Sequence, residues 1–116
     1  MNLTLRCIGL SPLLVATAAF AHHGWSEYDA SNPLTLEGTI KRSGYSHPHG
    51  TVRLQTTDKT WTVVLAPPSR MESRGLTKDM LKAGNSATVV GYANRNKTDE
   101  LRAERITIGD KTTELR

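Results

Sequence analysis

The four histidines of this chain lie in two tight pairs, and histidine is the commonest metal-binding side chain in proteins. His22 and His23 are adjacent, and His47 and His49 flank Pro48. No other histidine occurs among the 116 residues, and this distribution favours a metal site over four independent surface residues. We therefore predict a metal site whose ligands are His22, His23, His49 and His47.

The first pair follows a segment with the features of an export signal. Residues 1–21 carry one early charge, Arg6, and then an apolar run that ends in Ala19-Phe20-Ala21, a small-x-small cleavage motif. The run is too short to span a membrane with confidence. We expect a signal peptide over residues 1–21 and a periplasmic protein with no membrane anchor after cleavage, whose first residue is His22.

A histidine at the amino terminus offers a metal ion both its amine and its ring nitrogen. This chelate resembles the histidine brace of some copper proteins, and a nitrogen from the second pair would complete it. On an extended segment, His47 and His49 would point to the same side. A nitrogen-rich site without thiolate favours copper over zinc or nickel. A cut that leaves Ala21 first would place His23 third, where it could bind Cu(II) or Ni(II) with backbone nitrogens.

Other side chains near the first pair offer weaker candidates. Tyr28 and Asp29 could add oxygen ligands, although packing and turn roles suit them better. Met71 and Met80 occupy helical positions that suit a core, and Glu27 suits a solvated surface. No combination of nucleophile, base and acid is evident, so we expect a binding role rather than an enzyme.

Composition limits the class of protein. The only cysteine, Cys7, lies in the expected signal peptide, so the mature domain must hold itself together without disulfides. The chain has 15 Lys and Arg against 11 Asp and Glu, and these charges are scattered rather than clustered. A scattered charge does not favour nucleic acid as a partner. The expected partners are a metal ion and another periplasmic protein.

Alternating apolar residues predict strands over residues 34–41, 52–55, 60–65, 87–93 and 101–108. A short helix is expected between the third and fourth strands. The expected fold class is all-β, a small five-stranded OB-like barrel with that helix between strands 3 and 4. A two-sheet sandwich is the alternative. The parity change along the last strand predicts a bulge near Glu104 or Arg105, and Gly38 indicates a bulge or sharp bend in the first.

The expected organisation has four parts: the signal peptide at 1–21, a histidine-containing arm at 22–33, the barrel at 34–110 and a polar tail at 111–116. Trp25 and Tyr28 are the large apolar groups that would pin the otherwise irregular arm to the barrel. Ser69 and Glu72 have the spacing of a capping box for the short helix. Gly75 is expected to end that helix.

Several of these segments together resemble a family of small exported bacterial proteins, domain of unknown function family 6152. Its members begin the mature chain with His-His after Ala, and carry Asn-Pro-His where this chain has His47-Pro48-His49. They also share the strand pattern of residues 34–40, a Pro-x5-Arg-Gly segment like 68–75 and a Thr-x-Asp-x-Leu-Lys-x-Gly run like 77–84. The resemblance implies export and an OB-like barrel, and places His22, His23 and His49 at family positions. His47 stands where the family has Asn, and the family brings no established activity.

These observations predict an exported metal-binding protein, with copper held by the mature N-terminal histidines and the His-Pro-His loop, for metal buffering, delivery or sensing. The alternative is a periplasmic OB-fold module that binds a small ligand or an envelope protein without metal. Aromatic side chains gathered on one barrel face, from Tyr45, Trp61 and Tyr92, would favour that alternative.

Overall fold

The computed structural model describes residues 24–116, so the expected signal peptide, His22 and His23 lie outside the described residues. In chain order the elements are the 3-10 helix η1 (Trp25–Glu27), strands β1 (Tyr28–Gly44), β2 (Thr51–Gln55) and β3 (Thr60–Val64), the helix α2 (Pro68–Ser73), the 3-10 helix η2 (Lys78–Leu81), and strands β4 (Ser86–Asn94), β5 (Glu100–Ile108) and β6 (Lys111–Glu114).

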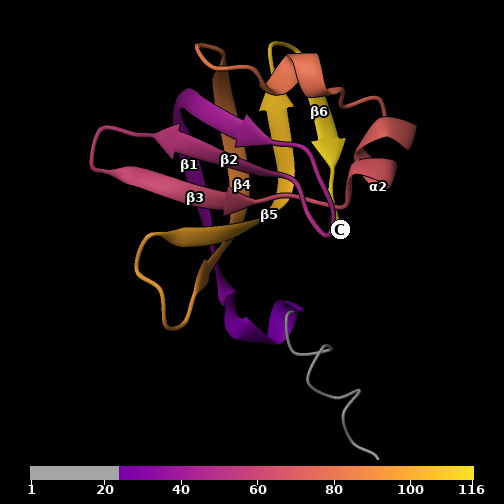
Figure 1. Cartoon of the computed structure of the whole chain (residues 1–116). Coiled ribbons are helices and arrows are strands. Elements are labelled where there is room, and N and C mark those ends of the chain that lie inside the picture. The colour runs from indigo at the N-terminus through magenta and orange to yellow at the C-terminus, as the bar shows by residue number, and fades with distance from the viewer. Residues whose placement is uncertain (1–23) are drawn as a thin grey trace, which may run out of the picture.

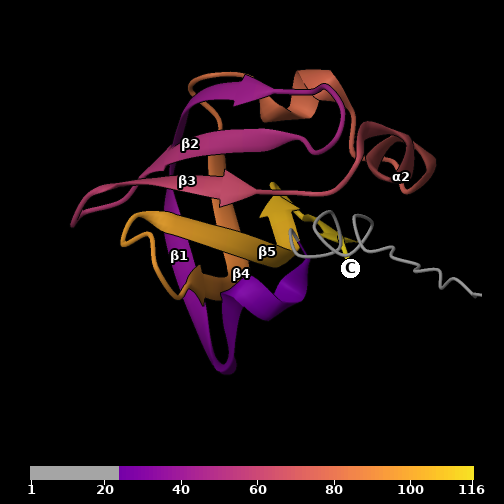
Figure 2. The same cartoon turned by 60° about the horizontal axis from the view of Figure 1, so that its bottom comes forward.

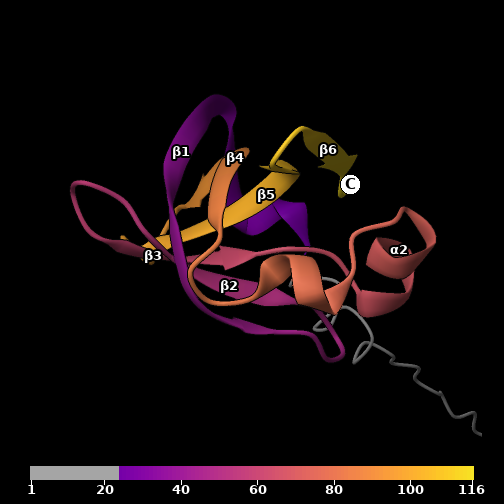
Figure 3. The same cartoon turned by 90° about the horizontal axis from the view of Figure 1, so that it is seen from above.

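The described strands form one sheet in the order β3-β2-β1-β4-β5-β6. Neighbouring strands are antiparallel, and a parallel pairing of β3 with β5 closes the first five into a barrel-like ring (Figures 1 and 3). The mainly β fold, the barrel-like ring of β1 to β5 and the helix between strands 3 and 4 confirm the expected fold class, whereas β6 is a sixth strand that was not predicted. Because every described strand belongs to the same sheet, the two-sheet sandwich is excluded for this part of the chain.

The core fills the inside of the ring and the space between the ring and the segment with α2 and η2, which connects β3 to β4. Alternate residues of β2 to β5 point inward, which buries one side of each strand. The connection from β3 to β4, residues 65–85, closes one side of the ring with its own apolar side chains. The largest fully buried side chains are Ile40, Leu54, Leu65, Met71, Leu76, Leu81, Leu101, Ile106, Leu115, Val52, Val63 and Val89.

Register shifts interrupt the pairing of the long strands of the described chain at three places, one of them between Tyr28 and Pro33 in β1. Val90 pairs with Arg105 but Gly91 pairs with Ala103, so Glu104 is the extra residue of a bulge, as predicted. In β1 the register shifts between Ile40 and Arg42, which makes Lys41 rather than Gly38 the extra residue. Gly38 instead marks a close approach, since a Cβ there would lie 2.2 Å from the carbonyl oxygen of Gln55.

The predicted capping box at α2 is wrong. Pro67 is the N-cap residue, Pro68 begins the helix, and no side chain caps it. Proline suits the first helical position because its φ is already fixed and its missing N–H would have no partner there. The predicted end is confirmed: Gly75 has φ of +84° and donates its N–H to the Glu72 carbonyl over 3.0 Å.

Both ends of the described chain are more regular than predicted. Strand β1 begins at Tyr28, earlier than residue 34, but its pairing with β4 is interrupted between Tyr28 and Pro33, so the stretch expected to be irregular does break the register. The expected polar tail forms β6 and buries Leu115. Arg70 and Arg74 of the α2 region donate to the carbonyl oxygens of Leu115 and Glu114 over 3.0 and 2.7 Å. These bonds explain why α2 lies beside the C-terminus (Figure 1).

Among residues 24–116, no helix has both the length and the apolar character needed to cross a membrane.

Candidate functional site

A pocket of about 610 Å³ opens where the N-terminal arm meets the ring, and we call it the arm pocket. Five segments meet there: the arm, the loop of residues 45–50, the end of β3, the β4–β5 turn and the start of β5. The parallel pairing of Val64 with Arg102 brings the β3 and β5 walls together. The lining residues are Glu27, Tyr28, Pro48, His49, Val64, Lys97, Glu100 and Arg102.

The start of the described chain lies next to β4 and β5 (Figure 2). Trp25 fastens the arm there, beside the pocket, through Tyr92 of β4 and Arg102 of β5. Its ring meets those of Tyr28 and Tyr92 edge-on, with centroids 6.5 and 5.9 Å apart. The guanidinium carbons of Arg102 and Arg116 lie 4.5 and 4.4 Å from the centre of the Trp25 ring. A cation that close to an indole is attracted by its electron-rich face. The prediction that Trp25 and Tyr28 hold the arm against the barrel is confirmed.

Tyr28 links the arm to β5 by a short hydrogen bond. Its hydroxyl donates to Glu100 Oε2 over 2.5 Å, and the Asn94 amide donates to the same oxygen over 3.3 Å. Lys97 Nζ lies 3.8 Å from the other carboxylate oxygen, Oε1. Burial of the phenol, followed by its hydrogen bond to Glu100, raises the pKa of Tyr28 to about 12. At neutral pH the pocket therefore contains a neutral phenol, which is a hydrogen-bond donor rather than a phenolate ligand.

Backbone bonds at both ends position the loop that carries the second histidine pair. Gly50 donates to the Ala66 carbonyl and accepts from the Leu65 N–H, at 2.9 and 2.8 Å. Gly50 is buried, and a Cβ on it would lie 2.5 Å from the terminal carbon of Met71. At the other end, the Tyr45 hydroxyl donates to the Leu76 carbonyl over 2.6 Å. These anchors fix the residue before Gly50, which is His49.

The two histidines of this loop have different surroundings. His49 is half-buried and lines the arm pocket, whereas His47 is exposed and is not among the lining residues. The expected extended His47-Pro48-His49 segment is wrong, because residues 47 and 48 form a bend with a cis peptide bond. His22 and His23 lie outside the described residues. Within residues 24–116, no three His, Cys, Asp or Glu side chains gather closely enough to hold a metal ion.

The side chains that were weaker candidates for metal binding have structural roles. Asp29 accepts hydrogen bonds from the Asn32 amide and from the Ser31 hydroxyl and backbone, which lower the pKa of its carboxyl, and so it stabilises a turn. Met71 is fully buried and Met80 packs against the core. These contacts, with the Tyr28 hydrogen bond described above, confirm the predicted turn, packing and core roles.

Sequence reasoning missed the wall that β5 supplies to the arm pocket. Glu100 and Arg102 flank the fully buried Leu101, so both point to the side of β5 away from the core. Arg102 is nevertheless only 8% exposed, since Trp25 of the arm covers it. The alternation in β5 was visible in the sequence. The parallel pairing of β3 with β5, which joins residues 38 positions apart, was not.

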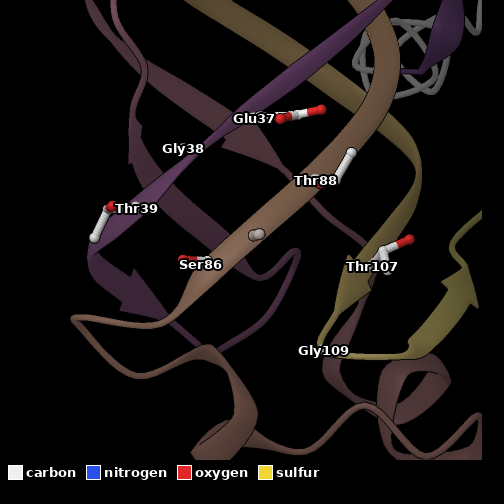
Figure 4. Close-up of a pocket in the computed structure, with 8 residues that line it drawn as sticks. Glu37, Gly38, Thr39, Ser86, Thr88, Thr107 and Gly109 are labelled. Carbon is white, nitrogen blue, oxygen red and sulfur yellow. The ribbon is translucent and has the colours of Figure 1, made fainter.

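A second hollow, of about 460 Å³, lies on the outer surface of β1, β4 and β5 (Figure 4), and we call it the sheet groove. Its residues come from regular strands and one turn, and are Glu37, Gly38, Thr39, Ser86, Ala87, Thr88, Thr107 and Gly109. The short side chains labelled in Figure 4 point in different directions along the surface. Because they do not converge, the groove offers no set of groups aimed at one ligand atom.

The aromatic side chains that would support a metal-free binding face are occupied elsewhere. Tyr45 packs against the core and bonds to Leu76, while Tyr92 contacts the arm at Trp25. Trp61 also packs against the core, and the Lys59 ammonium lies 4.2 Å from its ring centre. The three rings therefore do not form a common stacking surface.

Comparison with solved structures returns a likeness of fold. A crystal structure of TiaS in complex with an isoleucine tRNA and ATP matches with a TM-score of 0.52 and 17% sequence identity, over 73% of this chain. The match covers 19% of that protein, so this chain corresponds to about a fifth of its length. At this identity the likeness concerns the fold alone. No curated protein matches the sequence.

Comparison with protein-family models covers most of the chain. Residues 12–102 match one model, which takes in the arm, the loop of the second histidine pair and the strands from β1 to the start of β5. Every lining residue of the arm pocket falls within this range. The chain therefore belongs to the family of unknown function DUF6152.

Proposed function

We propose that this protein is an exported metal-binding protein that holds a copper ion at the arm pocket, for buffering, delivery or sensing of the metal. The ligands are the amine and ring of His22, the ring of His23 and the ring of His49. In this proposal residues 1–21 are a signal peptide, and the mature protein works in the periplasm. Copper is preferred over zinc and nickel because nitrogen ligands follow the Irving–Williams order.

One observation carries the proposal: the arm and His49 line the same pocket. Glu27, on the pocket wall, is four residues after His23 in the sequence. Four residues span at most about 14 Å even when fully extended. The covalent chain therefore keeps His23, and His22 with it, within reach of the pocket that contains His49.

The anchoring of the arm supports a site that is formed before the metal arrives. Trp25 is held by two rings and two guanidinium groups, and Tyr28 is held by Glu100. The His49 side of the pocket is fixed through Gly50. A metal that binds between two fixed segments loses less free energy to ordering the chain than one that must fold a loose terminus.

The side chains of the pocket wall suit a metal ion that is bound by nitrogen atoms rather than by a phenolate oxygen. Tyr28 keeps its proton up to a pKa of about 12, so it does not compete as an anionic oxygen ligand. Glu100 already accepts from Tyr28 and Asn94 and lies near Lys97. Glu27 and Glu100 together offset the positive charges of Lys97 and Arg102 on the same wall, so the lining residues carry no net positive charge that would repel a cation.

The second histidine pair supplies a matched test. His49→Ala removes the imidazole that lines the pocket, and His47→Ala removes an exposed imidazole from the same loop. We expect the Cu(II) dissociation constant, measured by competition with a chromophoric chelator on the exported protein, to rise at least about tenfold for His49→Ala, since even outer-shell partners of metal ligands are worth 10–100-fold. The change for His47→Ala should stay below about threefold. Equal effects of the two substitutions would contradict the proposed ligand set.

A further inference from the structure

Three cationic residues lie at the bulge of β1, far along the strand from the arm. Arg42 is the register partner of Arg53 on β2, and Lys41 is the extra residue between Ile40 and Arg42. Two residues on the bulged strand therefore oppose a single residue on its partner. Like charges that face each other across antiparallel strands destabilise the pairing. This arrangement costs folding free energy unless a negative group lies between the cations.

The surroundings supply hydroxyl groups but little negative charge. A hollow of about 250 Å³ at this place is lined by Arg42, Ser43, Gly44, Thr51, Val52, Arg53 and Thr62, with no Asp or Glu among these residues. Arg53 Nη1 donates to Thr62 Oγ1 over 2.6 Å. The carboxylate paired with this guanidinium is that of Asp99, at 3.9 Å, and its side chain is 56% exposed. A contact this long and exposed does not neutralise three cations.

The combination of groups suits an oxoanion. Guanidinium groups bind phosphate oxygens through paired N–H donors, and neighbouring hydroxyls can donate to the remaining oxygens. Arg42, Arg53, Thr51 and Thr62 line this hollow, and their register places their two guanidinium groups and two hydroxyls on the same face of the sheet. Ser43 pairs with the buried Val52 and lies on the opposite face. We propose that it binds a phosphate group, either as the free anion or at the end of a larger molecule, and we call it the bulge site. Lys41, which is exposed beside it, adds positive charge at its rim.

The bulge site is independent of the proposed copper site. The two hollows share no lining residue, and neither His47 nor His49, the histidines of the described chain, lines the bulge site. A failure of copper binding would leave the proposal unchanged. The converse also holds, because the proposed copper ligands do not include Arg42 or Arg53.

Thermal unfolding with inorganic phosphate tests the bulge site. Phosphate is titrated against NaCl at constant ionic strength into the parent and the Arg42→Gln variant. Ligand binding to the folded state raises the melting temperature with a saturable dependence on concentration. We expect a saturable rise for the parent that is lost in Arg42→Gln. Phosphate also stabilises proteins by exclusion from their surface, but this contribution is common to both, so the difference between them is the measurement.

A second outcome separates a binding site from a structural role. Without phosphate, Arg42→Gln should melt at the same temperature as the parent or higher, because it removes the opposing charge from Arg53. The control is Arg95→Gln, an exposed arginine at the β4–β5 turn, which should keep the full response. Glycerol 3-phosphate in place of phosphate tells whether an ester is accepted. A rise in Arg42→Gln equal to that of the parent, or no saturable rise in the parent, would overturn the proposal.

Discussion

The arm pocket and the sheet groove are both large hollows of the described chain, about 610 and 460 Å³, but they differ in how their walls are made. Five separate segments meet at the arm pocket, and it gathers an imidazole, a phenol, two carboxylates and two cationic groups. Regular strands and one turn make the groove, and its hydroxyls diverge (Figure 4). Polar and ionisable side chains gather at the arm pocket because irregular segments meet there. On the surface of regular strands, side chains are spaced evenly and do not gather.

Among substitutions in or beside the two hollows, Trp25→Ala should have the largest effect on stability. Trp25 joins the arm to Tyr28, Tyr92, Arg102 and Arg116, and its loss removes all of these contacts. We expect a loss of about 3 kcal/mol in the free energy of unfolding, at the lower end for a truncated Trp because this ring is only half-buried. Urea unfolding of the parent and the variant measures this loss. Copper affinity should fall as well, and an unchanged affinity would show that the arm need not be anchored.

Tyr28→Phe should have a smaller effect that depends on pH. The variant loses a hydrogen bond to a carboxylate, which is worth about 2 kcal/mol at neutral pH. The pKa of Tyr28 is raised to about 12 in the folded state, so the folded protein holds this proton more tightly than the unfolded chain does. The advantage of the parent is therefore complete below the unfolded pKa of about 10, and is lost as the pH rises from there through about 12.

Urea midpoints of parent and Tyr28→Phe across pH 7 to about 11.5 test this sign. The two stability curves should run parallel to about pH 10 and then converge. A gap that stays constant over the whole range would mean that folding does not raise the pKa of Tyr28, and would contradict the hydrogen bond described here. Tyr92→Phe is a matched control, since the Tyr92 ring contacts Trp25 and no hydroxyl bond to Glu100 is lost.

Gly50→Ala tests the other side of the pocket. The new methyl group would lie 2.5 Å from the Met71 terminal carbon and 3.2 Å from the Gly44 carbonyl, so the methionine must move. We expect a cost of about 1–2 kcal/mol from overpacking. Because Gly50 fixes His49, copper affinity should fall together with stability. Gly84→Ala provides a comparison without crowding, since a Cβ there meets nothing within 4 Å, although its φ of +98° also costs strain.

The smallest effect is expected in the sheet groove. Glu37→Gln removes the only carboxylate among its lining residues. Surface substitutions away from special features change stability by less than about 0.5 kcal/mol, and we expect the same here, with copper affinity unchanged. A loss of copper binding comparable to that of His49→Ala would show that the groove, rather than the arm pocket, holds the metal.

The fold was predictable because it follows local patterns. The succession of the first five strands along the chain, the helix before β4, the bulge at Glu104 and the helix end at Gly75 are all set by alternation, parity or glycine within a few residues. Strand β6 was missed because Lys111-Thr112-Thr113-Glu114 has no apolar alternation. It is held instead by pairing with β5 and by arginines from the α2 region.

The site was predictable only in part. The sequence indicated that Trp25 and Tyr28 hold the arm, because they are its only large apolar groups. It could not show that Glu100 and Arg102 reach the same pocket, since that depends on a parallel pairing between distant strands. It also suggested that His47 and His49 lie on one extended segment, whereas a bend at residues 47–48 leaves only His49 on the pocket wall. The site on His22 and His23 stays a prediction.

The most direct test of the proposed copper site is intact-mass spectrometry of the exported protein under native conditions with one equivalent of Cu(II). The parent is compared with the His22→Ala, His23→Ala double variant. We predict a chain that begins at His22 and retains one copper ion, and a double variant that retains none. A start at Ala21 with copper retained would replace the terminal chelate with the alternative geometry. A parent that retains no copper, or a double variant that retains it as well as the parent, would contradict the proposed function.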